Sequence, residues 1–345
     1  MATLTEVSYT TRKVIKYGGI CLVLLIAGRA LFLAGIDYWK KMNPPPPPPP
    51  TVEFGRLKAI QFPNQEKENI NYTLQLPTID FPEFPDRAKV FVIPYKLPSF
   101  TIWDTAKTEA AALGFKNDPE ELTSNIYRWT TTTPVTATLK MNIIDGSFVY
   151  NYFWQEDPNI IGGRLPSESE AVEETLSFIG KAKKPGSDLI NGESKVTYVK
   201  YVGNKLIPTL SISEGDLAKV NLFRANIEEM PVVTPIPSKG IVSALLSGYL
   251  SQPVLEMEYN YFPVDYSSFA TYPIKTARQA WEELKQGKGY IASSSEVNNN
   301  IVVRRAYLGF YDSYEPQTYL QPIYIFSGDD DFLAYVPAII EEWYQ

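Results

Sequence analysis

One apolar run constrains the fold of this chain more than any other feature. Residues 18–36 read GGICLVLLIAGRALFLAGI and contain a single charge. Their number is close to the roughly 20 residues that a helix needs to cross the hydrocarbon core of a bilayer. Tyr17 precedes the run and Tyr38 and Trp39 follow it, as in the aromatic belts of membrane interfaces. We therefore predict one transmembrane helix over residues 18–39.

A cleaved signal peptide is the alternative interpretation of this run. The stretch before it is long for the charged region of a signal peptide, and no clean small-x-small cleavage site follows it. A retained anchor is therefore preferred. Three basic residues precede the helix and two follow it, so the positive-inside rule places residues 1–17 in the cytoplasm as a short tail. The C-terminal domain is then expected outside the cytoplasm, on the far side of the cell membrane.

Arg29 lies inside the predicted span, where a charge costs about 2.5–3.5 kcal/mol on insertion scales. Ala27, Ala30 and Ala34 fall on one face of a helix, and small residues permit the close approach of a second helix. With Arg29 placed beside that face, these four residues are candidates for contact with a partner helix. The alternative is that Arg29 extends toward the outer headgroups and contacts only lipid and water.

A proline run, Pro44 to Pro50, follows the apolar run. Such a run adopts the polyproline II helix at about 3.1 Å per residue, which makes a stiff spacer of roughly 22 Å. A ligand for SH3 or WW grooves is the alternative, but the position beside the membrane favours a spacer. We predict a stalk over residues 40–50 that holds a large domain away from the bilayer.

The chain beyond the stalk is acidic. Residues 51–345 hold 26 of the 32 Lys and Arg and 37 of the 39 Asp and Glu, a net charge of −11. A surface of this charge repels phosphate backbones, so nucleic acid is not expected as a partner. The chain has no histidine, and its single cysteine, Cys21, lies in the apolar run. These counts exclude catalysis and metal sites that depend on histidine or cysteine clusters, and no cofactor is expected.

The large domain is predicted to be α+β, with helices packed on antiparallel sheets. Scattered prolines in residues 51–100 indicate an extended segment with little helix. After it, helix-then-strands patterns recur. We assign residues 101–265 to a first α+β domain and residues 266–345 to a second one.

Local signals define the expected elements. Ser167 with Glu170, and Thr276 with Gln279, have the spacing of capping boxes, and an Asp-Gly pair between alternating apolar runs is typical of a hairpin turn. The expected helices are residues 102–113, 167–180 and 276–287. The expected strands include residues 137–144, 147–154, 196–202, 301–310, 319–326 and 332–336.

The C-terminal stretch, about residues 272–338, resembles a known family. A helix with the sequence TARQAWEELKQG precedes a strand with a glycine–aromatic pair, LGFY, then a strand that starts LQPIY, then the aromatic strand FLAYV. This order is similar to the end of the YycH/YycI-type regulatory membrane proteins and to the smaller PepSY module. The resemblance implies one membrane helix, an extracytoplasmic domain, and a non-catalytic role as the partner of another membrane protein. The stalk and residues 51–100 depart from the family.

Several polar groups were weighed as sites. An aspartate triplet has the oxygen ligands of a calcium loop but not the EF-hand spacing, and adjacent glutamates on a helix point apart instead of forming an acid/base pair. Tyrosine-rich strands are either a carbohydrate- or peptide-binding surface or, more often, core. No catalytic, cofactor or metal site is predicted. The residues considered are Asp329, Asp330, Asp331, Glu282, Glu283, Glu341, Glu342, Ser293 to Ser295, Asn298 to Asn300, and the sequon at Asn71.

These observations favour a membrane-anchored, non-catalytic, extracytoplasmic interaction or regulatory protein of the bacterial cell envelope. Its expected partner is another membrane protein, such as a sensor kinase or an envelope complex. One alternative is a structural subunit of an envelope or secretion assembly. Another is a carboxylate-based cell-wall hydrolase.

Overall fold

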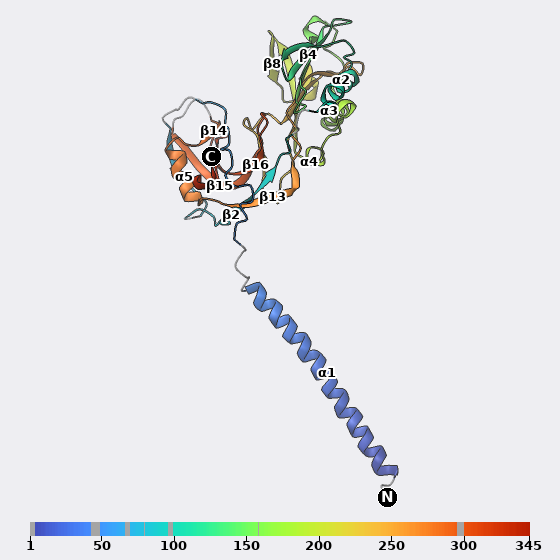
Figure 1. Cartoon of the computed structure of the whole chain (residues 1–345), viewed down its shortest axis with the longest axis vertical. Coiled ribbons are helices and arrows are strands. Elements are labelled where there is room, and N and C mark those ends of the chain that lie inside the picture. The colour runs from blue at the N-terminus through green and yellow to red at the C-terminus, as the bar shows by residue number, and fades with distance from the viewer. Residues whose placement is uncertain are drawn as a thin grey trace. The chain divides into compact units, whose positions relative to one another are not determined.

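A computed structural model of the chain describes residues 4–42, 49–65, 70–78, 80–95, 99–157, 159–294 and 300–345. The chain divides into two compact units, residues 1–49 and residues 50–345 (Figure 1). Five of the seven prolines in the predicted stalk, residues 44–48, lie outside the described residues.

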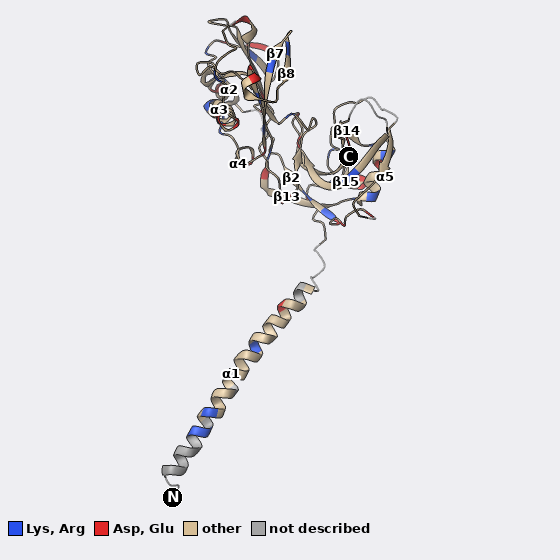
Figure 2. Cartoon of the chain, turned by 180° about the vertical axis from the view of Figure 1, so that it is seen from behind, with Lys and Arg blue, Asp and Glu red and all other residues tan. Residues whose placement is uncertain are grey.

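The first unit is one long helix, α1, from Leu4 to Met42. Its segment Ile15–Trp39 is long and apolar enough to cross a membrane, and it is the single such helix in the described part of the chain. The predicted span, residues 18–39, falls inside this segment. Figure 2 shows basic residues in blue along α1 and an acidic residue in red near its end. In the sequence, Arg29 follows the basic residues of the first half of α1, and Asp37 comes near the end of the helix. The length and composition of the helix fit a membrane anchor or a signal sequence.

A nine-stranded antiparallel sheet forms one half of the second unit. Its order is β3-β4-β5-β6-β12-β11-β9-β7-β8. The predicted hairpin is confirmed, because β5 and β6 pair across the Asp145-Gly146 turn. The strands are β3 (Glu120–Thr123), β4 (Ile126–Thr131), β5 (Ala137–Asn142), β6 (Phe148–Tyr152), β7 (Ser194–Val202), β8 (Lys205–Pro208), β9 (Leu217–Leu222), β11 (Val242–Leu246) and β12 (Val254–Tyr259).

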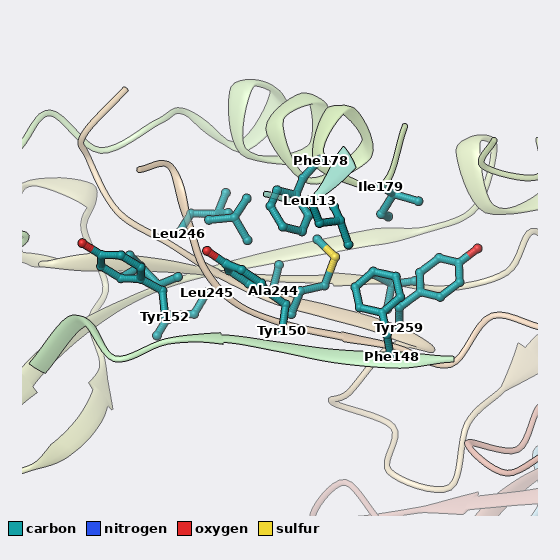
Figure 3. Close-up of a cluster of buried hydrophobic side chains, with 14 of the residues drawn as sticks. Leu113, Phe148, Tyr150, Tyr152, Phe178, Ile179, Ala244, Leu245, Leu246 and Tyr259 are labelled. Carbon is teal, nitrogen blue, oxygen red and sulfur yellow. The ribbon is translucent and has the colours of Figure 1, made fainter. Parts of the chain in front are cut away.

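Two helices, α2 (Ile102–Ala112) and α3 (Glu168–Ala182), pack on this sheet. The capping box at Ser167 is confirmed, and α3 continues two residues beyond the predicted end at Gly180 because the chain first becomes extended at Lys183. Figure 3 shows Phe178 and Ile179 of α3 over the aromatic residues of the sheet. The rings of Phe178 and Tyr150 lie 5.0 Å apart. Burial of these apolar side chains is the main force that holds the two layers together.

An eight-stranded sheet forms the other half, along the path β1-β15-β16-β17-β14. Strand β2 pairs with β13 and β16, and β10 pairs with β15. The strands are β1 (Asn71–Leu74), β2 (Arg87–Val92), β10 (Val232–Val233), β13 (Asp265–Pro273), β14 (Tyr290–Ser293), β15 (Asn300–Tyr311), β16 (Tyr319–Gly328) and β17 (Leu333–Pro337). Short helices α4 (Ser187–Ile190), η1 (Trp154–Glu156), η2 (Ile212–Glu214) and η3 (Glu341–Trp343) complete the fold.

Both faces of this second sheet are covered. Helix α5 (Ala277–Lys285), with the predicted capping box at Thr276, places Trp281 5.7 Å from Phe326 on one face. On the other face Phe62 stacks on Tyr290 at 5.1 Å and meets Tyr311 edge-on at 4.8 Å. The chain from residue 51 to residue 65 therefore crosses the sheet as an extended strap.

The two sheets are not built from the separate consecutive segments that the sequence predicted. Strands β1 and β2 lie in residues 51–100 but pair with strands of the C-terminal half. Val90 and Phe91, neighbours in sequence, are both buried, so β2 is covered on both faces and does not alternate. The fold is α+β as expected.

Candidate functional site

A buried group of charged and polar side chains is centred on Arg224. Helix α4 brings Asp188 to it, and the approach depends on Gly186: a Cβ at that position would lie 1.8 Å from the Tyr261 hydroxyl and 2.6 Å from an Asp188 oxygen. The amide of Ala225 donates to the backbone carbonyl of Asp188 at 2.7 Å. This backbone hydrogen bond holds the end of β9 against α4.

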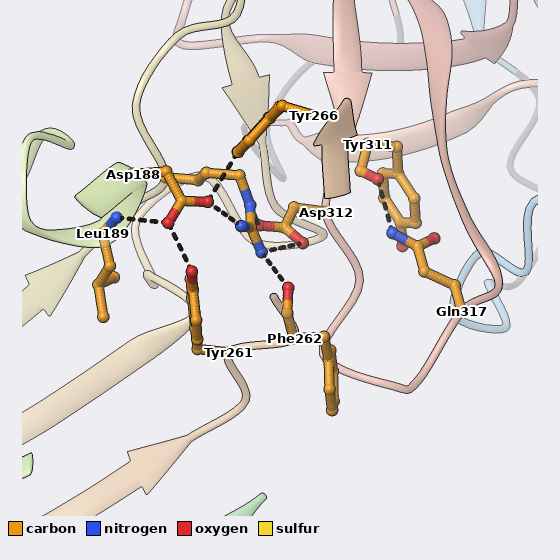
Figure 4. Close-up of polar contacts among 9 residues, drawn as sticks. Asp188, Leu189, Tyr261, Phe262, Tyr266, Tyr311, Asp312 and Gln317 are labelled. Atoms are coloured by element: carbon orange, nitrogen blue, oxygen red, sulfur yellow. Dashed lines mark hydrogen bonds and ion pairs between the residues drawn. The ribbon is translucent and has the colours of Figure 1, made fainter. Parts of the chain in front are cut away.

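The Arg224 side chain is completely buried, and each of its guanidinium nitrogens has an acceptor. Figure 4 shows the residues that accept these bonds, Asp188, Phe262 and Asp312, close together. Its Nε donates to Asp312 Oδ2 at 2.8 Å, and its Nη2 donates to the Phe262 carbonyl at 2.9 Å. Its Nη1 donates to Asp188. Asp312 directly follows β15, so the guanidinium connects residues that border both sheets.

Asp188 accepts further hydrogen bonds from two tyrosines. The Tyr261 hydroxyl donates to Oδ1 at 2.5 Å and the Tyr266 hydroxyl donates to Oδ2 at 2.7 Å. The guanidinium of Arg224 also lies over the Tyr261 ring, 4.8 Å from its centroid. Because each guanidinium nitrogen has an acceptor and each carboxylate oxygen of Asp188 and Asp312 has a donor, the cluster meets the hydrogen-bonding demand that burial imposes on charged groups.

The electrostatics of the two carboxyl groups differ. Burial raises the pKa of Asp312, which lies fully inside the protein, and Arg224 offsets this only in part. Burial also acts to raise the pKa of Asp188, but Arg224 and the two tyrosine hydroxyls outweigh it and lower that pKa. Burial and the adjacent Asp188 raise the pKa of Tyr261. The arginine stays charged, because the attraction of both carboxylates exceeds its own desolvation.

The charged groups of the cluster are paired with one another and buried. The side chains of Arg224 and Asp312 are 0% and 1% exposed, and Asp188 is 10% exposed, so a substrate could reach the ion pairs only if the packing opened. The three charged side chains also engage one another and leave no carboxylate facing open solvent. We interpret the cluster as an internal tie between the two halves of the domain.

The predicted partner-helix residues lie in α1. Ala27, Ala30, Ala34 and Arg29 are all exposed, and the three alanines share one face. The prediction that Arg29 lies beside this face is wrong. At about 100° per residue it is roughly 130° around the helix from the centre of the alanines. One partner helix therefore meets either the alanines or Arg29, and contact with a partner stays a prediction.

The carboxylates considered as possible metal or acid/base sites form ordinary ion pairs. Asp329 binds Arg304 through two contacts, of 3.0 and 2.7 Å. Glu283 pairs with Lys275 at 2.7 Å and Glu282 with Lys285 at 2.8 Å, so these neighbours engage separate lysines. Within the described ranges, no group of three or more His, Cys, Asp or Glu could hold a metal ion.

The remaining candidates lie in varied surroundings. Asn71 is exposed at the start of β1, and its amide contacts Asn300 at 3.3 Å. Glu341 and Glu342 lie in η3, and Ser293 ends β14. Ser295, Asn298 and Asn299 lie outside the described residues. The tyrosine-rich strands are mainly core: Tyr259, Tyr261, Phe262 and Tyr272 are buried.

The Arg224 cluster was not predicted from the sequence. Its members are 36 and 88 residues apart along the chain, a separation over which no local pattern operates. A weak signal was present, because Arg224 and Asp312 each follow closely on an apolar strand. A charge at such a place is buried when the strand end is covered.

No protein-family model matches the chain, and no curated protein matches it. Among solved structures, it is similar to an uncharacterized protein from Eubacterium rectale, at 10% sequence identity and a TM-score of 0.36. The match covers 74% of this chain and 84% of that chain. A likeness at this level carries no argument about function.

Proposed function

We propose that the chain is a membrane-anchored, non-catalytic interaction protein of the bacterial cell envelope that acts through another membrane protein. The observation that carries the proposal is the apolar segment Ile15–Trp39 joined to a large folded unit. Helix α1 runs on to Met42 without a break, which favours a retained anchor over the short apolar core of a signal peptide. The resemblance to YycH/YycI-type proteins supports the same role.

The proposed topology places residues 1–17 in the cytoplasm and the folded domain outside. Epitope tags at each end report on it when protease is added to intact protoplasts. We expect loss of the C-terminal tag and survival of the N-terminal one. A protected C-terminal tag that is lost only after lysis would contradict the topology.

Contact with a partner helix is tested on the two faces of α1 separately. Arg29→Leu removes the charge and Ala30→Leu fills the alanine face, with Arg29→Lys and Leu24→Ala, which lies on neither face, as controls. Membrane proteins that co-purify with the anchored chain are quantified by mass spectrometry. If the anchor recognises a partner, one of the two test variants loses it and the controls keep it. If all four variants retain the partner, recognition lies in the folded domain.

A further inference from the structure

A small groove opens at the start of α3. Its apolar walls include Leu165, Pro166, Leu246 and Pro253. Its charged lining consists of Glu170 and Glu174 of α3 and of Arg164, which pairs with Glu170, so Glu174 is the unpaired charge. The groove measures about 270 Å³, which is below the roughly 300–1,000 Å³ typical of small-molecule sites. Its size suits one large side chain from another protein.

The groove is held open by two loops that touch through their backbones. A Cβ at Gly248 would lie 2.4 Å from the carbonyl carbon of Gly163, so any larger residue forces the loops apart. The β11–β12 loop is also tied internally, because Ser247 Oγ donates to the Gln252 carbonyl at 2.7 Å. The site is therefore formed before any partner arrives, which lowers the entropy cost of binding.

The lip of the groove is apolar and exposed. Leu250 is 93% exposed and Tyr249 is 36% exposed, both at the tip of the β11–β12 loop. Apolar side chains that stand out of a preformed groove are typical of a protein-binding surface, since a partner can bury them.

The charged lining contains a carboxylate without a partner. Glu174 is half-buried, and no hydrogen bond or ion pair joins it to another described residue. Its neighbour Glu170 accepts from Ser167 at 2.8 Å and lies 3.6 Å from Arg164. An unpaired carboxylate beside apolar space attracts a cation that arrives with an apolar group.

We propose that this groove binds an extended basic segment of the partner protein. A large apolar side chain fills the space beside Leu165 and Leu246, and an adjacent Lys or Arg pairs with Glu174. The inference rests on the proposed function, because it supplies the contact by which the folded domain recognises its partner.

The test uses the full chain in nanodiscs of zwitterionic lipid and fluorescent peptides read by anisotropy. The probe has a Lys-Leu-Lys core between Gly-Ser repeats, and the comparison peptide has a Glu-Leu-Glu core. We expect saturable binding of the basic probe that weakens as salt is added, and at least about tenfold weaker binding of the acidic one.

Matched variants locate the site. Glu174→Gln should weaken the basic probe about fivefold and reduce its salt dependence, whereas Glu173→Gln, on the exposed side of α3, should not. Leu250→Ser should weaken binding at every salt concentration, whereas Leu122→Ser, an exposed leucine on β3 at the edge of the sheet, should not.

Two outcomes overturn the proposal. One is equal binding of the two peptides, or of the basic peptide to all variants. The other is self-association of the chain that Leu250→Ser abolishes, which would assign the groove to a second copy. Failure here is distinct from failure of the proposed function, because the co-purifying partner and the protease topology are measured independently of the groove.

Discussion

Replacement of Arg224 by Met tests whether the buried cluster holds the domain together. Methionine fills much of the space of the arginine side chain without its charge. The change leaves Asp312, whose side chain is 1% exposed, without its cation. Removal of one partner from a buried ion pair typically costs about 3–5 kcal/mol.

The structure also sets how this cost changes with pH. A buried Asp312 without a cation becomes neutral by binding a proton. This protonation costs about 1.36 kcal/mol for each pH unit by which the solution lies above the ordinary aspartate pKa of about 3.9. The free-energy cost of protonating Asp312 is therefore at most about 4 kcal/mol at pH 7 and about 1.5 kcal/mol at pH 5. The raised pKa of Asp312 means that the wild-type protein already bears part of this cost, so these values are upper limits. We therefore expect Arg224→Met to destabilise by at most about 4 kcal/mol at pH 7, and by less at pH 5 than at pH 7.

Urea unfolding of the full chain in mild detergent, followed by tryptophan fluorescence, measures these free energies. In the control, Asp312→Asn is added to Arg224→Met, and the part of the difference between pH 7 and pH 5 that Asp312 causes should disappear. Any difference that remains reports Asp188, which also loses its cation. An equal loss of stability at both pH values would show that Asp312 carries no charge beside Arg224 in the native protein. A loss below about 1 kcal/mol at pH 7 would refute the reasoning altogether.

Three further changes have defined outcomes. The pKa of Asp188 is lowered in the folded protein, so its ionised form stabilises the fold above the ordinary aspartate pKa. This stability is lost as the pH falls through the lowered pKa. Asp188→Asn should therefore flatten the curve of unfolding free energy against pH, measured in urea, below about pH 4. Thr276→Ala removes the cap of α5 and should cost about 1 kcal/mol in urea unfolding, with Thr276→Ser close to wild type. Gly186→Ala should displace the Tyr261 hydroxyl and cost about 1–3 kcal/mol, seen as a lower melting temperature in calorimetry.

Elements specified by neighbouring residues were predictable from sequence. The capping boxes at Ser167 and Thr276 each act over three residues, and the hairpin at Asp145-Gly146 depends on its turn. The boundaries shifted by one or two residues because the last turn of a helix depends on what packs beside it.

Pairings between distant segments were not predictable. Strand β2 pairs with β13, about 180 residues further along the chain, and the proline-rich sequence around it indicated only an extended conformation. Nothing local distinguishes an extended linker from an inserted strand. The groove beside α3 was hidden for a related reason, because Gly163 and Gly248 meet only in the folded chain.

The cluster and the groove lie at opposite ends of the same strands, and this predicts independent effects. Leu246, at the groove, pairs with Ala218 near the start of β9, whereas Arg224 follows the end of β9 at Leu222. At about 3.3 Å per residue, Ala218 and Arg224 are roughly 20 Å apart along the chain, beyond the 7–10 Å over which mutations usually couple. Arg224→Met should therefore lower the free energy of unfolding and leave peptide affinity unchanged in the absence of strong denaturant. Leu250→Ser should weaken peptide affinity and leave the free energy of unfolding unchanged. A double variant that departs from additivity by more than about 0.5 kcal/mol in either measurement would show that the tie and the groove communicate through the sheet.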